Sequence, residues 1–595
     1  MRNVAACRSS ALAWLALGLV LSRSGTAQEI EPFSETIEVQ VVNVEVIVTD
    51  RQGEPVTGLT REDFEVYEDG RQVELTNFFA VEGRSTVLAP GETEEDSLPA
   101  PATRNLSLVV FIDNLNTRPE NRNLIFGNLE EYLRANLDPR DRVMLVAMGG
   151  VVEVIEAFTN DVDQLKESLD RVSKEVGQHV RDEVDHRTLL RRMQQARMPP
   201  SPAQGGPILD LGGLRDFEDA QVEAIRLAND IRFLAERRYR KVQVATEALA
   251  HFTDTLAGLR GRKAVLYVSD GLALRAADSM AQGWLNKFEA WAAAQDAAAA
   301  LGALRDMETL ALSSELDAGD LFDRLVTHAS NNGVAFYTIS NSSRASPRGV
   351  SAEFGAPGTA HGQGPMSPDV VALETQSLES SLLRMAGGTG GLTFTGTANV
   401  AGLLDRMIGD FETFYSLGYS PPAGRDGQPH RVEVKVKRGG LDARHLGSYR
   451  LKDPLAELQD RTLSALHYGI VDNGFAMRLD PGRQVRSGRK SYQVPIWLKI
   501  PFHKLVLLPQ EGFHVAQLSV FVVARDLKGG VSPFQQIQLP IRVPDADLEQ
   551  AMMSAATYPI QLEMQQGWQR VSVGVRDHLG RLDATANVDL EVGAR

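Results

Sequence analysis

The pattern of apolar and polar residues changes character twice along the chain. From residue 106 to residue 339, short runs of consecutive apolar residues alternate with stretches of helical periodicity. Strands buried on both faces have such continuous runs, and strands separated by helices form a mostly parallel sheet. We therefore predict an α/β domain at residues 105–450. Its expected strands are residues 106–112, 143–147, 151–158, 264–268 and 334–339, with residues 414–419 as the last.

Helical periodicity occupies the segments between these runs. The expected helices are residues 121–136, 162–172, 221–259 and 321–331. Three insertions interrupt the α/β pattern: a basic segment broken by Pro and Gly at 179–215, an Ala-rich helical segment at 279–312, and a Gly/Pro/Ser loop at 341–368. Long loops of this kind are uncommon in compact domains and are often functional or disordered.

Both flanks of this region show the features of β-structure. Residues 37–48 alternate mostly between apolar and polar, and Asp69-Gly70 separates two short apolar segments, which is typical of a hairpin. We predict a small β domain at 37–82, followed by a linker at 83–103 that is rich in Pro, Gly, Ser, Thr and acids. Short strands separated by turns predict an antiparallel β-sandwich at 455–595. The expected fold class is multidomain α/β and β.

The N-terminus has the layout of a secretory signal. Arg2 and Arg8 precede an 11-residue apolar stretch at 11–21, and Gly25-Thr26-Ala27 supplies small residues for cleavage before Gln28. A membrane helix needs about 20 apolar residues, and no later stretch of the sequence has that character. We expect residues 1–27 to be a signal peptide, and the protein to be periplasmic or secreted. No transmembrane segment is expected to remain after cleavage.

Charge and cysteine usage exclude several classes of function. The formal net charge of −16 at pH 7 opposes a broad electrostatic contact with nucleic acid, so we expect no nucleic-acid partner. Cys7, the only cysteine, lies in the predicted signal. The mature chain would then have no thiol for disulfides, iron–sulfur clusters or cysteine catalysis. The sequence also lacks the His-Glu-x-x-His and Gly-x-Ser-x-Gly motifs of zinc proteases and serine hydrolases.

Two acids lie at the carboxyl ends of predicted strands. Asp113 ends the first strand, in Asp113-Asn114-Leu115-Asn116-Thr117, and Asp270 ends the fourth, in Ser269-Asp270-Gly271. Ligands bind at this edge of an open α/β sheet, and acids with hydroxyls nearby suit Mg²⁺ or Ca²⁺. The alternative is a structural role, in which Asp113 caps a helix or hydrogen-bonds its loop and Asp270 shapes a turn before Gly271.

This constellation resembles the von Willebrand factor type A domain, which holds a divalent metal at an Asp-x-Ser-x-Ser loop, a second-loop Thr and a third-loop Asp. Asp113 matches the first position, Thr117 the last, and Asp270 the third-loop acid. Leu115 replaces the middle Ser, and the nearest second-loop candidate, Thr246, lies in a helical pattern. The resemblance implies a degenerate site with weak Mg²⁺ or Ca²⁺ binding and no other cofactor. Its ligands would be Asp113, Asn116, Thr117 and Asp270.

A longer series of motifs follows in order along the chain. The strings are Val48-Thr49-Asp50-Arg51-Gln52-Gly53, Gly58-Leu59-Thr60-Arg61-Glu62-Asp63-Phe64, Tyr67-Glu68-Asp69-Gly70, Asp113-Asn114-Leu115-Asn116-Thr117, Gly261-Arg262-Lys263, Tyr415-Ser416-Leu417-Gly418-Tyr419 and His430-Arg431-Val432-Glu433-Val434. Together they are similar to the VWFA-related proteins of the acidobacterial type, over roughly residues 37–450. The resemblance implies a von Willebrand type A-like fold and an exported protein. It implies no specific function, because that family has no well-defined activity.

Three other features have structural explanations. Gly387-Gly388-Thr389-Gly390-Gly391 follows a helical segment, the reverse of the order in a phosphate loop, and predicts a helix end and a turn. Trp284, Phe288 and Trp291 recur at helical spacing and are expected to pack against the α/β body, with a partner surface as the alternative. The arginines of residues 181–197 are mixed with acids, so a solvated helix face explains them at least as well as an anionic partner.

The sequence therefore predicts an exported, non-enzymatic protein of the protein-binding or adhesion type, whose protein partner it does not identify. A second hypothesis is a metal-assisted hydrolase that uses the same acidic sheet edge. It is weaker because no general base or nucleophile accompanies the acids in the sequence. A third hypothesis is a structural component of the envelope whose metal site has decayed.

Overall fold

The computed structural model describes most of the chain from residue 41 onward. The predicted signal peptide at 1–27 and most of the predicted linker at 83–103 lie outside the described residues, as does most of the insertion at 341–368. The described residues are 41–82, 85–87, 107–137, 139, 141–175, 179–197, 211–259, 261–276, 278–294, 298–312, 316–341, 368–397, 399–422 and 427–593.

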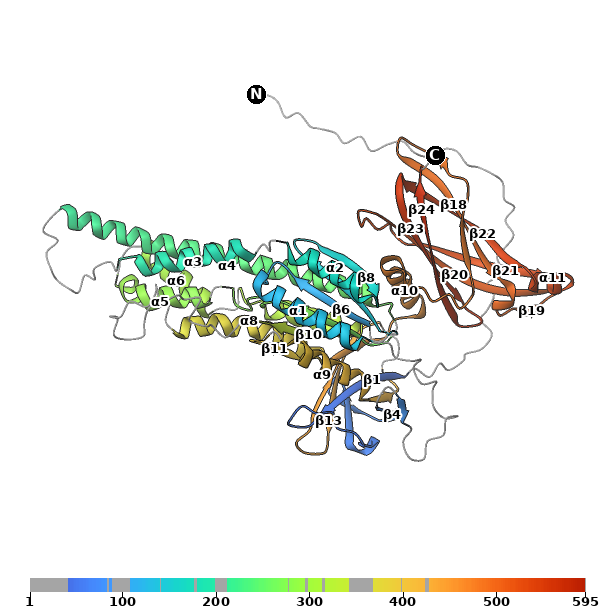
Figure 1. Cartoon of the computed structure of the whole chain (residues 1–595), viewed down its shortest axis with the longest axis horizontal. Coiled ribbons are helices and arrows are strands. Elements are labelled where there is room, and N and C mark those ends of the chain that lie inside the picture. Colours follow the sequence, from blue (N-terminus) through green and yellow to red (C-terminus); the bar gives the residue numbers. More distant parts are fainter. Residues whose placement is uncertain are drawn as a thin grey trace, which may run out of the picture. The chain divides into compact units, whose positions relative to one another are not determined.

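A six-stranded sheet forms the centre of the α/β region, with the strand order β11-β10-β9-β6-β7-β8 (Figure 1). Its strands pair in parallel except for β8, which is antiparallel to β7. The mostly parallel sheet and five of its strand positions agree with the sequence prediction. The strands are β6 (Ser107–Asp113), β7 (Arg142–Met148), β8 (Val152–Thr159), β9 (Lys263–Val268), β10 (Val334–Ser340) and β11 (Thr393–Thr395).

Helices cover both faces of this sheet, because successive side chains of a strand point to opposite faces. In β6, Leu108, Val110 and Ile112 enter one hydrophobic cluster, whereas Val109 and Phe111 enter the other. The first cluster is closed by α1 (Pro119–Asn136), α2 (Val162–Ser173) and α9 (Val400–Glu412). The second is closed by α4 (Leu211–Leu256), α7 (Gly319–Asn331) and α8 (Pro368–Gly388).

The helical insertions have a core of their own. The amino-terminal half of α4 packs with α3 (His179–Gln195), α5 (Asp278–Ala293) and α6 (Ala298–Leu312) around one cluster (Figure 1). Trp284, Phe288 and Trp291 are buried in it. The sequence predicts that they pack against the α/β body. Their cluster combines the insertion helices α3, α5 and α6 with the amino-terminal half of α4, a helix of the predicted α/β domain, and the indole N–H of Trp284 donates to the Ala224 carbonyl of α4 at 2.9 Å.

The N-terminal strands share two sheets with strands from residues 414–450. One sheet has the order β14-β1-β12-β4-β5 and the other β15-β13-β2-β3. The prediction that residues 414–419 close the α/β sheet is wrong, since these residues form β12 between β1 and β4. The strands of residues 42–82 therefore form their sheets together with strands of residues 414–450, which the sequence prediction assigned to the α/β domain. The strands are β1 (Val42–Thr49), β2 (Phe64–Glu68), β3 (Arg71–Val73), β4 (Leu75–Glu82), β5 (Ser85–Val87), β12 (Phe414–Tyr419), β13 (Pro429–Val436), β14 (Asp442–His445) and β15 (Ser448–Arg450), with a 3-10 turn at Arg61–Asp63.

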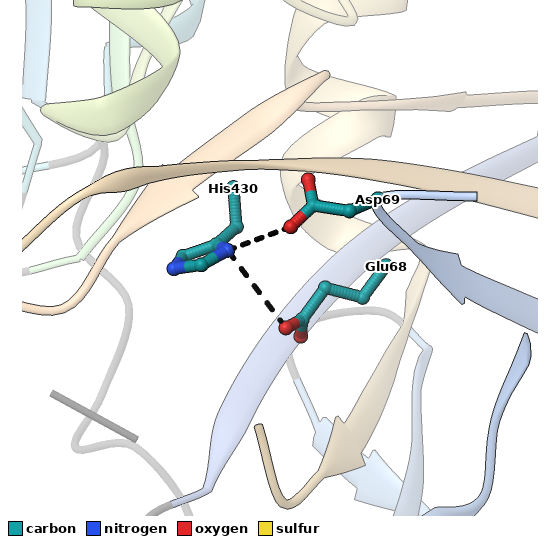
Figure 2. Close-up of side chains that lie close together, drawn as sticks. All are labelled: Glu68, Asp69 and His430. Carbon is teal, nitrogen blue, oxygen red and sulfur yellow. Dashed lines mark hydrogen bonds and ion pairs between the residues drawn. The ribbon is translucent and has the colours of Figure 1, made fainter. Parts of the chain in front are cut away.

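The hairpin predicted at Asp69-Gly70 joins β2 to β3, and both turn residues have positive φ, 47° and 80°. Positive φ at both positions suits the right-handed twist of a two-residue hairpin. The turn brings Asp69, together with Glu68, beside His430 of β13 (Figure 2).

The C-terminal region contains a helix, α10 (Pro454–Tyr468), and two antiparallel sheets that share one hydrophobic cluster. Alternate residues of facing strands, such as Val494, Ile496, Val520 and Val573, fill that cluster. One sheet contains β16 (Arg478–Pro481), β17 (Val485–Arg486), β18 (Ser491–Pro501) and β22 (Ala555–Gln565); the other contains β19 (Leu508–Gln510), β20 (Phe513–Asp526), β21 (Gln535–Pro544), β23 (Gly567–Asp577) and β24 (Leu582–Val592). Short helical turns lie at Phe502–Lys504, Asp545–Asp547 and α11 (Leu548–Met552).

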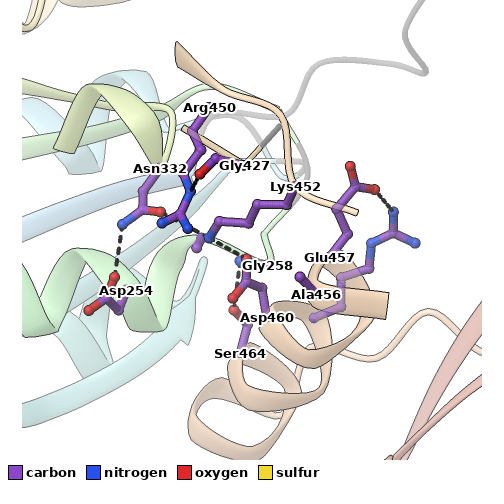
Figure 3. Close-up of polar contacts among 12 residues, drawn as sticks. Asp254, Gly258, Asn332, Gly427, Arg450, Lys452, Ala456, Glu457, Asp460 and Ser464 are labelled. Carbon is purple, nitrogen blue, oxygen red and sulfur yellow. Dashed lines mark hydrogen bonds and ion pairs between the residues drawn. The ribbon is translucent and has the colours of Figure 1, made fainter. Parts of the chain in front are cut away.

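Helix α10 contacts both the end of α4 and the sheet that contains β23. A Cβ on Gly258 would lie 2.2 Å from the carbonyl oxygen of Asp460, and one on Gly574 would lie 2.0 Å from the Thr462 hydroxyl. Only glycine permits such close backbone approach. Around this contact, the N–H of Gly258 donates to the Ser464 hydroxyl, and the Lys452 ammonium donates to the Asp460 carboxylate (Figure 3).

None of the described helices combines the length and the apolar character that a membrane crossing requires.

Candidate functional site

The loop after β6 is organised around the carboxylate of Asp113, which is fully buried. Its oxygens accept hydrogen bonds from the backbone N–H groups of Leu115 and Asn116, each at 3.1 Å, and from the Asn116 amide at 2.8 and 3.1 Å. The hydroxyl of Tyr267 in β9 donates at 2.5 Å, and that of Ser269, just after β9, donates at 3.1 Å. The carboxylate thus holds its own loop and ties it to the neighbouring strand.

These donors leave little capacity on Asp113 for a cation. A carboxylate offers about four lone-pair sites, and five donor groups already address them. Burial, and then the charge of Asp113, raises the pKa of Tyr267 well above its usual value, so Tyr267 remains a protonated donor. The Asn116 amide must turn its NH₂ group toward the carboxylate, because its oxygen would be repelled there.

Asp270 lies at the end of the adjacent strand and is bonded in a similar way. Its oxygens accept from the backbone N–H of Arg118 at 2.9 Å and from the Asn121 amide at 2.9 Å. The Thr117 hydroxyl donates to the carbonyl oxygen of Asp113 at 2.6 Å and lies 3.2 Å from the last carbonyl of β9. The fold therefore brings the four predicted residues to one sheet edge, where each is bonded to the chain itself.

The residues present do not fit a tight site for Mg²⁺ or Ca²⁺, which take six or more oxygen ligands. Leu115 supplies no side-chain oxygen. Thr246, the nearest second-loop candidate, donates instead to the carbonyl oxygens of Val242 and Gln243 inside α4. The geometry favours the structural alternative for Asp113, in which the acid hydrogen-bonds its loop.

Two cations that the sequence analysis did not single out bond groups of this loop. Arg122 of α1 is fully buried and donates to the Asn114 amide oxygen at 2.8 Å. Burial lowers the pKa of Arg122, although a guanidinium remains charged at physiological pH. Lys241 of α4 donates to the carbonyl oxygen of Leu115 at 2.8 Å. The available signal was the spacing of Arg122 from Ile125, which places the arginine on the buried face of α1.

The same sheet edge carries an exposed apolar residue. The turn between β7 and β8 contains Gly149, Gly150 and Val151, and Val151 is 76% exposed. This turn follows Met148, which pairs with Asp113 across the parallel strands β6 and β7. Val154, on the edge strand β8, is 37% exposed. The hairpin surface, defined here as Val151 and Val154, is therefore a pair of exposed apolar residues on the hairpin that β7, the strand paired with β6, forms with β8.

A second constellation arises in the N-terminal sheets. Glu68, Asp69 and His430 are the one group of three potential metal ligands that the described part of the chain brings together (Figure 2). No sequence motif joins these residues, because 361 residues separate Asp69 from His430. The hydrogen bond from His430, followed by that from the backbone of Arg431, lowers the pKa of Asp69.

Comparisons with known proteins add little to this description. No family model matches the chain, and no curated protein matches it. Among solved structures, a conserved hypothetical protein BatB from Bacteroides thetaiotaomicron is similar over 52% of this chain and 97% of its own, with a TM-score of 0.21 and 9% identity. A beta-glucuronidase from Bacteroides uniformis covers 31% of this chain and 19% of its own, with a TM-score of 0.14 and 8% identity. Scores this low carry no argument about fold or function.

Proposed function

We propose that this protein is an exported, non-enzymatic binding protein with a von Willebrand type A-like α/β domain and a C-terminal β-sandwich. Its partner is a protein that contacts the sheet edge at the carboxyl ends of β6 and β7. The observation that carries the proposal is the complete engagement of Asp113 by donors of its own chain. An acid bonded in this way shapes a loop for recognition and is poorly suited to act as a base or nucleophile.

The hairpin surface supplies the contact with the partner. Val151 is exposed at a turn whose preceding strand pairs with the Asp113 strand, so the rigid loop and the apolar side chain are held by one sheet. Binding residues are commonly placed on loops that a rigid scaffold positions. The interaction therefore rests on shape and apolar contact at this edge, with Asp113 in a supporting role.

The test is cross-linking and affinity capture from envelope extracts with the full chain and a Val151→Asp variant. A charge placed in an apolar contact should reduce capture of a specific partner by about tenfold or more. The matched control is Leu527→Asp, since Leu527 is 75% exposed in another β-turn, between β20 and β21. Equal capture by both variants would place the binding surface elsewhere.

An activity screen tests the alternative of a metal-assisted hydrolase. A panel of hydrolase substrates, tested with purified protein and with Asp270→Asn, should show no turnover that depends on Asp270. A Mg²⁺-dependent activity that Asp270→Asn removes would favour the metal-assisted hydrolase.

Export has its own test. N-terminal sequencing of the mature protein should begin at or close to Gln28. A mature chain that retains Met1 would contradict the proposed signal peptide.

A further inference from the structure

Glu68, Asp69 and His430 face one another across two paired strands. Glu68 ends β2, Asp69 begins the turn to β3, and His430 lies on β13. Because Val432 pairs with Glu68, His430, two residues away along β13, lies on the same face of the sheet as Glu68. The Nδ1 atom of His430 is 2.8 Å from Oδ2 of Asp69 and 3.9 Å from Oε1 of Glu68 (Figure 2).

Each carboxylate uses one oxygen for an outer partner and presents the other to the imidazole. The Tyr449 hydroxyl donates to Oε2 of Glu68 at 2.9 Å, and the backbone N–H of Arg431 donates to Oδ1 of Asp69 at 2.9 Å. Oε1 and Oδ2 are left facing Nδ1 of His430. Outer hydrogen bonds that orient the ligating atoms in this way are the usual surroundings of protein metal ligands.

The surroundings add an independent observation. Tyr419 of β12 is fully buried, its hydroxyl lies beside Glu68 and Tyr449, and it makes no hydrogen bond of normal geometry to any described residue. Glu68 and His430 are buried as well, whereas the side chain of Asp69 is 53% exposed and gives access from solvent. Two carboxylates facing one imidazole leave excess negative charge in the cluster, even when the imidazole is protonated. A buried, unpartnered hydroxyl beside such a cluster fits a bound metal ion that carries a water molecule, because that water would hydrogen-bond the hydroxyl.

We propose that Glu68 Oε1, Asp69 Oδ2 and His430 Nδ1 bind one divalent transition-metal ion of the Zn²⁺ class, with water in the remaining position and the Tyr419 hydroxyl bonded to that water. One nitrogen and two oxygens form a donor set that suits Zn²⁺ better than Mg²⁺ or Ca²⁺. Bonds of about 2.0–2.1 Å in a tetrahedron place ligand atoms about 3.3 Å apart. The observed 2.8 and 3.9 Å lie on either side of that spacing. The ion replaces the proton that Nδ1 shares with Asp69.

Such an ion would tie the N-terminal hairpin to β13, which is 361 residues away in the sequence. It would therefore stabilise the two sheets that the N-terminal strands share with residues 414–450, because an ion that binds only the folded state raises its stability by mass action. This role is independent of the proposed partner contact at Val151.

The experiment uses tag-free, chelator-treated full chain titrated with ZnCl₂ by calorimetry, and with CoCl₂ by visible absorption. The wild type should bind one ion per chain, show the intense absorption of tetrahedral Co²⁺, and melt several degrees higher with Zn²⁺. Glu68→Gln and His430→Gln should weaken binding by about 100-fold or more, and Tyr449→Phe, which removes only an outer partner, by about tenfold.

The matched control is His514→Gln, because His514 bonds Asp545 at 2.9 Å in a simple histidine–carboxylate pair. This variant should bind Zn²⁺ as the wild type does. Asp69→Asn, at the exposed ligand, provides a variant that should keep the fold, as checked by circular dichroism, and lose affinity. Absence of saturable Zn²⁺ binding by the wild type, or full binding by both Glu68→Gln and His430→Gln, would overturn the proposal.

Discussion

The sheet edge at Asp113 and the cluster of Glu68, Asp69 and His430 each contain a buried carboxylate, but the carboxylates of the two regions face different groups. Asp113 meets five donors from its own chain. Glu68 and Asp69 each keep one oxygen directed at an imidazole. The motif that resembles a metal site thus contains a carboxylate whose oxygens already accept hydrogen bonds from the chain itself. The arrangement closer to a metal site lies where no single motif predicted it.

The largest expected effect is a loss of stability when the Asp113 carboxylate is removed. Asp113→Ala should lower the free energy of unfolding by about 3–5 kcal/mol, because buried donors lose their acceptor together. Chemical denaturation with circular dichroism measures the change. Asp526→Ala is the control, since Asp526 also accepts turn N–H bonds but at an exposed site, and its loss should cost about 1 kcal/mol. Similar losses for the two variants would show that the Asp113 network is not unusual.

Lys263, a buried cation in the central sheet, should make the stability of the protein depend on pH. Burial lowers the pKa of Lys263 to about 8, and its ammonium group donates to the carbonyl oxygen of Asn332 at 3.0 Å. The unfolded chain, with a lysine pKa of about 10.4, binds more protons between these values, so stability from this residue rises with pH across that window. Relative to Lys263→Met, the wild type should gain up to about 3 kcal/mol between pH 7.5 and 10.5. A constant difference in unfolding free energy would contradict the lowered pKa.

A smaller change tests one donor of the Asp113 network. Tyr267→Phe removes the hydroxyl that bonds Asp113 at 2.5 Å and leaves the aromatic ring in place. The expected loss is about 1–2 kcal/mol in the free energy of unfolding, from the same denaturation measurement. Tyr558→Phe, on β22 of the C-terminal region, serves as a control for loss of a tyrosine hydroxyl. No loss from Tyr267→Phe would mean that the remaining donors satisfy the carboxylate alone.

The smallest expected effect concerns the hard cations. Calorimetric titration with Mg²⁺ or Ca²⁺ should give weak binding or none, because Leu115 contributes no ligand and the Asp113 oxygens are occupied. Tight binding that Asp270→Asn abolishes would show that the loop rearranges to accept an ion. Read together with the Zn²⁺ titration, this result tells which of the two regions holds a metal.

Local features of this protein were predictable from its sequence. The buried strands β6, β7, β9 and β10 have continuous apolar runs, and the turn at Asp69-Gly70 has the residues that positive φ requires. The end of α8 and the turn after it also agree with the Gly-rich string at 387–391. In each case the side chains that determine the element are neighbours in the sequence, so periodicity and turn chemistry are sufficient.

Pairing between distant segments was decided only by the tertiary structure. Phe414–Tyr419 is apolar enough for the central sheet, but its register with β1 and β4 places it in another one. The donors of Tyr267 and Ser269 reach Asp113 across neighbouring strands, and His430 reaches Asp69 across 361 residues. The sequence by itself determined which residues carry the acids, the imidazole and the buried strands. Whether an acid is satisfied or left facing another ligand depends on strand register, because strand register sets which distant side chains meet.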